Sequence, residues 1–220
     1  MSDPIDRIIR TIPAPFFRGV LEQIDAAFMK AARLTDQNIA EPERRSTLGQ
    51  LRHACTEEGV RIAAQDAGLV PLACHTEPSG GRYSLVSCGG VHLIRSNIQT
   101  HCGPPRATRF RKAWSALNAW LDPLQLNLLI EVEEPPSDRL CGMLVVTANG
   151  RNGNPSVPAF VGLGIPRQDL SAWVHLEPLT ALMGRYHDLE TASVATKEVL
   201  VEVRDNAVPK LKRRPPGNNN

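Results

Sequence analysis

The hydrophobic pattern changes its period at Gly68, and this change divides the chain into two kinds of structure. Before Gly68, apolar residues recur at the helical spacing, which predicts a helix over about 14–34 and a single bent helix between Pro42 and Gly68. After Gly68, short apolar runs alternate with turn residues, which is typical of strands. A chain of 220 residues is long enough to bury a core of its own. We therefore expect an α+β fold that begins with helices.

A pair of glycines, Gly89 and Gly90, separates two strand patterns over 82–88 and 91–98. Two glycines permit the positive φ angles that a tight hairpin turn requires, so the strands should form an antiparallel hairpin. The register that this turn sets pairs Leu85 with Ile94, Val86 with Leu93 and Ser87 with His92.

The remaining elements complete a mainly antiparallel mixed sheet with two glycine-rich hairpins, packed by three longer helices. We expect one domain over 1–204, made of N-terminal helices (1–67), a basic half (68–121) and an acidic half (122–204), followed by a disordered basic tail over 205–220. The further expected elements are strands at 69–75, 126–132 and 199–203, a helix from Pro105 to Pro123, a hairpin of 140–148 with 157–165, and a short helix at 179–186.

The order from the second helix onward is helix, three strands, helix, strand. This order is similar to that of the core shared by restriction-type nucleases. The resemblance implies Mg²⁺ held by carboxylates on the second and third strands, because a hard cation needs oxygen ligands. Here the strands at 82–88 and 91–98 contain no Asp or Glu. We therefore expect no metal site and no nuclease activity from such a core.

The charges are distributed unevenly along the chain, although the net charge is only +2. The 43 residues from Ser79 to Leu121 carry six basic side chains and no acidic one, whereas both flanking segments are acidic. Such a window is typical of a surface that meets an anionic partner.

Several of these cations are expected at the start of the helix that follows Pro105, where the backbone dipole disfavours positive charge. An anion bound at this position would compensate them, because guanidinium groups and free backbone N–H groups both bind phosphate. We therefore expect contacts to a DNA or RNA backbone, with sequence-independent, salt-sensitive binding. The candidate residues are Arg95, Arg106, Arg109, Arg111 and Lys112, aided by the tail residues Lys210, Lys212, Arg213 and Arg214.

Two alternatives remain open for the same basic segment. The acidic half, with Glu131, Glu133, Glu134 and Asp138, can fold against the cations and neutralise them, or the cations can form a merely solvated face. An acidic surface of a second copy or of another protein can also meet them, which would make the chain an interaction or assembly protein. In that case an amphipathic N-terminal segment is a candidate docking element, with Ile5, Ile8, Ile9 and Ile12.

Cysteine and histidine residues offer weaker chemistry. Adjacent pairs such as Cys74-His75 and His101-Cys102 point to opposite faces of a strand, which is unsuitable for a structural zinc site. A cysteine nucleophile at Cys88 or Cys102 has no acidic residue nearby to orient a histidine. We expect no metal and no cofactor, and we favour a non-catalytic role, with an enzyme of unrecognised site as a third option.

The cysteines also bear on the cellular compartment. They number five and are scattered along the chain, which fits reduced thiols and predicts a cytoplasmic protein. The first residues include acids and no continuous apolar stretch, so we expect no secretory signal. No apolar run reaches the roughly 18 residues that a membrane span needs, so we expect no membrane partner.

Overall fold

The chain divides into two compact units, Met1–Met183 and Gly184–Asn220. The six-stranded sheet lies in the first unit, and the described residues 184–189 and 191 belong to the second. The computed structural model describes residues 3–77, 80–98, 103–121, 138–150, 153–189 and 191.

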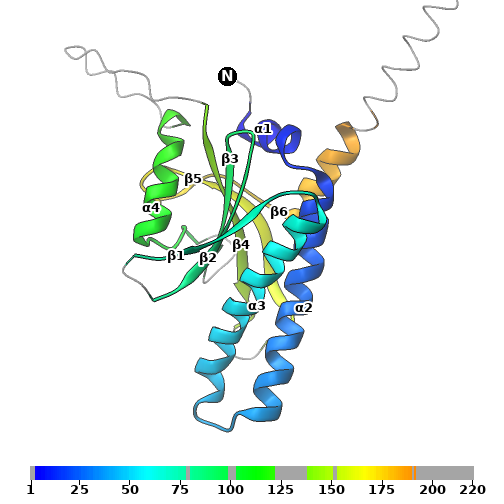
Figure 1. Ribbon diagram of the computed structural model, residues 1–220, viewed down its shortest axis with the longest axis vertical. Coiled ribbons are helices and arrows are strands. Elements are labelled where there is room, and N and C mark those ends of the chain that lie inside the picture. Colours follow the sequence, from blue (N-terminus) through cyan, green and yellow to red (C-terminus); the bar gives the residue numbers. More distant parts are fainter. Residues whose placement is uncertain are drawn as a thin grey trace, which may run out of the picture. The chain divides into compact units, whose positions relative to one another are not determined.

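Three helices begin the fold: α1 (Pro4–Thr11), α2 (Ala14–Asn38) and α3 (Arg44–Asp66). The carboxylate of Asp3 caps α1 by accepting a hydrogen bond from the Ile5 N–H at 3.0 Å. The prediction of a single helix between Pro42 and Gly68 is confirmed, because α3 continues without a break through Gly59. In Figure 1, α2 and α3 lie side by side as an antiparallel pair.

The α+β prediction with a mixed, mainly antiparallel sheet is confirmed. Six strands lie in sequence order across one sheet, and the pairing of β3 with β4 is parallel, whereas the other described pairings are antiparallel. The strands are β1 (Pro71–His75), β2 (Arg82–Cys88), β3 (Val91–Asn97), β4 (Leu140–Ala148), β5 (Pro158–Pro166) and β6 (Trp173–Pro178). From α3 the described elements follow the predicted order of helix, three strands and helix, whereas the strand expected next, at 126–132, lies outside the described residues.

The first hairpin has the predicted turn and register. Gly89 and Gly90 have φ angles of 49° and 78°, the left-handed values that this turn needs. Leu85 lies opposite Ile94, and the other two predicted pairs are also present. Strand β6 was not predicted from the sequence.

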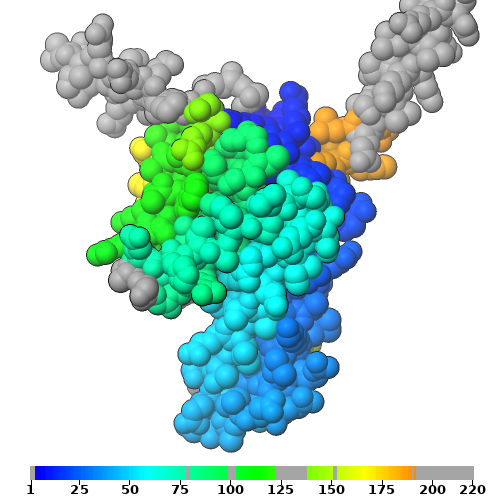
Figure 2. Space-filling view, viewed as in Figure 1, coloured from blue at the N-terminus to red at the C-terminus, as the bar shows by residue number. Residues whose placement is uncertain are grey.

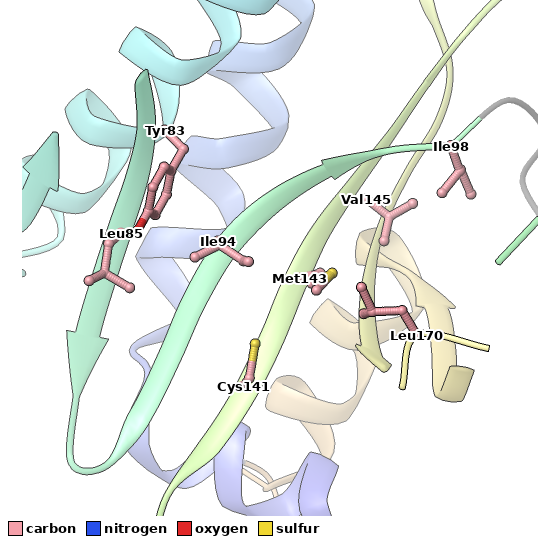
Figure 3. Packing of buried hydrophobic residues seen from close by; sticks show 8 residues of the cluster. All are labelled: Tyr83, Leu85, Ile94, Ile98, Cys141, Met143, Val145 and Leu170. Carbon is pink, nitrogen blue, oxygen red and sulfur yellow. The ribbon is translucent and has the colours of Figure 1, made fainter. Parts of the chain in front are cut away.

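The two faces of the sheet carry different helices. Tyr83, Leu85 and Ile94 belong to a buried cluster against which side chains of α4 (Arg109–Ser115) and of the 3₁₀ helix η1 (Ala116–Leu121) pack. Figure 3 shows eight residues of this cluster, which come from β2, β3 and β4 and from Ile98 and Leu170. Because side chains alternate along a strand, Ser84 and Arg95 point to the opposite face, where α3 lies.

The N-terminal isoleucines are part of the protein's own core. Ile5, Ile8, Ile9 and Ile12 are all buried. The docking role considered for them is therefore wrong for this fold, because their apolar surface is already covered.

Some sequence predictions lie outside the described residues. These are the strands at 126–132 and 199–203, the tail over 205–220 and most of the acidic residues proposed to neutralise the basic segment. The short helix expected at 179–186 is present, since residues 179–189 are helical.

Close packing between α2 and α3 at Gly59 leads to a stability prediction. A Cβ atom at this position would lie 3.0 Å from Gln23 Cβ and 3.2 Å from the Gln23 carbonyl oxygen. Gly59→Val should therefore lower the free energy of unfolding by about 1–3 kcal/mol, measured by urea denaturation. Gly49→Ala in the same helix is the control, because no atom lies within 4 Å of the added Cβ. This substitution should raise stability by about 0.5–1 kcal/mol through helix propensity. Equal effects of the two substitutions would contradict the packing.

Candidate anion-binding site

A buried ion pair joins α3 to the sheet. Glu57 on α3 and Arg95 on β3 are 4% and 2% exposed, and Arg95 Nε lies 2.8 Å from Glu57 Oε1. The other carboxylate oxygen of Glu57 accepts a hydrogen bond from the backbone N–H of Ser84 at 2.7 Å. Burying a carboxylate is costly unless it is paired and hydrogen-bonded, and both conditions are met here.

The ion pair lies where β2 and β3 separate. The ladder between these strands ends at Leu85 and Ile94, and Figure 3 shows β3 curving away from β2 beyond this point. The Ser84 N–H is satisfied by Glu57, and the Arg95 carbonyl accepts from Arg111 Nε and Nη2 at 3.4 and 3.3 Å. Side chains therefore supply the partners that a continued ladder would have supplied.

Arg111 brings a second guanidinium group into the same network. It is 8% exposed, and its other hydrogen-bond acceptors, at 3.5 Å, are the Arg106 carbonyl and the Thr108 hydroxyl. Burial first, and then the charge of Arg95, lower the pKa of Arg111 to about 10, so it remains a cation at neutral pH. Among the described residues of this network, Arg95 and Arg111 together face one carboxylate, that of Glu57, which leaves an excess of positive charge.

Two further side chains fix the orientation of Arg95. Its terminal nitrogens donate to Oδ1 of Asn97 and to Nδ1 of His53. A guanidinium group can only donate, so Nδ1 of His53 must accept and the neutral ring carries its proton on Nε2. Burial and the charge of Arg95 both lower the pKa of His53. The Arg95 side chain is thus held by three different partners.

A pocket of about 150 Å³ opens beside this network, at the carboxyl ends of the parallel strands β3 and β4. None of the described residues that line it is acidic. They are Phe28, Gly49, Arg52, His53, Thr56, Arg95, Asn97, Ile98, Val146 and Ala148.

Arg52 adds a further cation to the pocket. Its Nε atom is buried and makes no hydrogen bond in the described structure, while a terminal nitrogen donates to the Pro155 carbonyl. The guanidinium carbon lies 4.9 Å from the ring centre of Phe28, and burial lowers the pKa of Arg52. The pocket therefore offers hydrogen-bond donors and positive charge, which suit an anion.

A larger groove of about 600 Å³ adjoins the pocket, and Gly49 and Arg52 line both. It runs between the first turns of α3 and the tip of the β4–β5 hairpin. Its other lining residues are Glu41, Arg44, Arg45, Leu48, Asn149, Gly150, Gly153 and Pro155. Arg44 is paired with Asp36 at 3.1 Å, whereas Arg45 is exposed. Figure 2 shows that the first turns of α3 form part of the molecular surface.

The residues predicted from the sequence do not form one surface. Arg95 and Arg111 are buried in the network, whereas Arg106, Arg109 and Lys112 are exposed. The predicted tail residues lie outside the described part of the chain.

The expected crowding of cations at a helix start is also smaller than the sequence implied. The helix α4 has only seven residues and begins at Arg109, so Arg106 precedes it. Lys112 lies in the last turn, where the dipole favours a cation.

The residues predicted from the sequence did not include Arg52, His53, Glu57 or Asn97. The available signal was Glu57 itself, an acid that lies on the same helical face as the buried residues Val60 and Ala64. An acidic residue in an apolar stripe predicts a buried partner, but the partner on β3 is 38 residues away in the sequence.

The described cysteines Cys55, Cys74, Cys88 and Cys141 are free, and the described residues contain no group of three His, Cys, Asp or Glu side chains able to hold a metal ion. His101 and Cys102 lie outside the described residues.

Ser87 and His92 lie within hydrogen-bonding distance, with Ser87 Oγ 2.9 Å from His92 Nδ1. Arg139 donates to Nε2 of the same ring at 3.3 Å, so the ring proton lies on Nδ1. In this tautomer His92 donates to the serine and is not a base that activates it.

Comparison with known proteins gave no match: no family model, no curated protein and no solved structure is significantly similar to the chain. Among the described helices, none combines the length and apolar character needed to cross a bilayer.

The ion pair leads to a second prediction. Glu57→Gln leaves Arg95 buried without its counter-charge and should lower the free energy of unfolding by about 3–5 kcal/mol in urea denaturation. Glu58→Gln is the matched control, because Glu58 pairs with Lys30 at the surface and both side chains are about half exposed. That control should cost at most about 1 kcal/mol. Equal losses would show that Glu57 is not the anchor of Arg95.

The lowered pKa of His53 leads to a third prediction, for stability against pH. The unfolded state binds this proton more readily than the folded state, so stability falls as the pH drops below the ordinary value of 6.5. His53→Gln should give a shallower loss of stability between about pH 7 and pH 5 than the parent protein. His187→Gln provides a histidine control. An unchanged slope in His53→Gln would contradict the proposed neutral ring.

Proposed function

We propose that the protein is a non-catalytic nucleic-acid-binding protein. It holds phosphate groups in the groove of about 600 Å³ beside α3, here called the α3 groove, and in the adjoining pocket of about 150 Å³, here called the inner pocket. The observation that carries this proposal is the set of pocket residues. The guanidinium groups of Arg52 and Arg95 and the amide of Asn97 line the pocket, with no acidic side chain among the described lining residues. Guanidinium groups bind phosphate oxygens through charge-assisted hydrogen bonds, often in pairs.

The groove extends this positive character along α3. Arg45 and Arg52 contribute cations, and Glu41 is the one acid among the described lining residues. These lining residues include no aromatic side chain, so the described groove offers no platform for stacking bases. These features support contact with the sugar-phosphate backbone, largely independent of base sequence.

In this proposal three exposed cations make additional phosphate contacts, namely Arg106, Arg109 and Lys112. They belong to the segment that packs on the other face of the sheet from α3. Their contribution can therefore be tested separately from that of the groove.

We also place this function in the cytoplasm as part of the proposal. The four described cysteines are free thiols, which persist in a reducing compartment.

The fourth prediction tests the binding surface by fluorescence anisotropy with a short labelled duplex. Affinity should fall steeply between about 50 and 200 mM salt, because phosphate contacts release counterions. The double variant Arg45→Gln, Arg52→Gln should bind more weakly and should reduce the slope of log K against log salt by about 1 for each phosphate contact that it removes. The control is Arg18→Gln, Arg33→Gln, which removes two exposed charges of α2 outside the groove.

Three outcomes would contradict this proposal. Binding that does not depend on salt would exclude phosphate contacts, and equal weakening in the control would mean that only net charge matters. The third outcome is weaker binding in the double variant Arg109→Gln, Lys112→Gln with no change in Arg45→Gln, Arg52→Gln. It would show that the α4 segment, and not the groove, is the interface.

A further inference from the structure

We infer that the inner pocket takes a terminal phosphate, the phosphomonoester at the end of a nucleic-acid strand, while the groove takes the adjoining nucleotides. This inference rests on the proposed function and specifies the ligand of the same site. It follows from the size of the pocket, from its charge and from the arrangement of its donors.

The size of the pocket limits what can enter it. A volume of about 150 Å³ is the share of roughly five water molecules and lies below the range of about 300–1,000 Å³ typical of sites for whole small molecules. A phosphate group fits this space. The adjoining groove, at about 600 Å³, lies within that range and has room for a nucleotide.

The charge of the surrounding network matches a doubly charged group. Arg52 and Arg95 line the pocket, and Arg111 donates a hydrogen bond to the backbone carbonyl of Arg95. Against these three guanidinium groups, the described residues of the network supply one carboxylate, that of Glu57. A phosphomonoester carries between about −1.5 and −2 charges at neutral pH, whereas a phosphodiester or a carboxylate carries one.

The donors are already oriented before any ligand binds. Arg95 uses one N–H each on Glu57, His53 and Asn97, which leaves two of its five N–H groups. The oxygen of Asn97 accepts from Arg95, so its amide nitrogen is the group left to donate. Together with the unpaired Nε of Arg52, these donors suit a ligand with three acceptor oxygens.

An internal phosphate fits this arrangement less well than a terminal one. It has two free oxygens, and the chain must leave it on both sides. The described pocket adjoins the groove through Gly49 and Arg52, which provides a path for the chain on one side. A strand end needs only one such path.

The test compares labelled strands of one sequence that carry a 5′-phosphate, a 3′-phosphate or hydroxyl groups at both ends, using the full chain and fluorescence anisotropy. One of the phosphorylated strands should bind about tenfold more tightly than the strand with two hydroxyl ends, because it gains charge-assisted hydrogen bonds. Inorganic phosphate should occupy the pocket and abolish this difference in affinity. The weaker binding of both strands to the groove should remain.

Asn97→Asp is the decisive variant. It keeps an oxygen that accepts from Arg95 and replaces the amide donor by a negative charge facing the ligand. The preference for a phosphorylated end should be lost, so that the phosphorylated strand and the strand with hydroxyl ends bind this variant with equal affinity. Gln168→Glu adds the same charge at an exposed residue outside both linings and should keep the preference. Thermal unfolding shows whether Asn97→Asp folds. If it does not, Arg52→Met replaces it, because this substitution keeps an unbranched side chain and removes the guanidinium group that lies over Phe28.

The outcomes separate the two proposals. Equal binding of all strands overturns the terminal-phosphate inference and leaves the nucleic-acid function intact. A preference that survives both Asn97→Asp and Arg52→Met also overturns it, because another site must then recognise the end. Failure of every strand to bind overturns the proposed function itself.

Discussion

The ion pair between Glu57 and Arg95 is the contact on which the fold and the site both depend. It joins α3 to the sheet at the point where β2 and β3 separate, and its carboxylate also satisfies the Ser84 N–H. A charge buried in this position without its partner would be strongly destabilising. Because the same interaction fixes the Arg95 guanidinium, the direction of the donors in the pocket follows from the packing of α3. Stability and the proposed phosphate binding are therefore linked through one side chain.

The network is not electrically balanced by the described residues that contact it. Arg111 donates hydrogen bonds only to neutral oxygens among its described partners, and Arg52 keeps a buried N–H without an acceptor. An unsatisfied buried donor costs about 1–3 kcal/mol, and this cost disappears when an anion supplies the acceptor. A ligand that binds the folded state alone also stabilises it by mass action. The imbalance is thus the physical reason for proposing that this region binds an anion.

The basic segment recognised in the sequence and the basic site found in the structure overlap at Arg95 and Arg111. The segment stands out in the sequence because it contains no acidic residue. The site, in contrast, combines Arg52 of α3 with Arg95 of β3, which are far apart in the sequence. Water solvates exposed cations such as Arg109, and water and salt screen their attraction to an anion. Such cations therefore bind a ligand less tightly than cations in a pocket do. Burial therefore separates residues that look equivalent in the sequence.

Local interactions determined much of the fold. The helical periodicity predicted α2 and α3, and the positive φ angles available to Gly89 and Gly90 predicted the hairpin and its register. Only the tertiary structure decided the site. Glu57 and Arg95 are 38 residues apart, and no local pattern indicates that β2 and β3 part at Ile94 and leave backbone groups for side chains to satisfy. Periodicity reports which face of an element is buried, but which charges meet there depends on how distant elements pack.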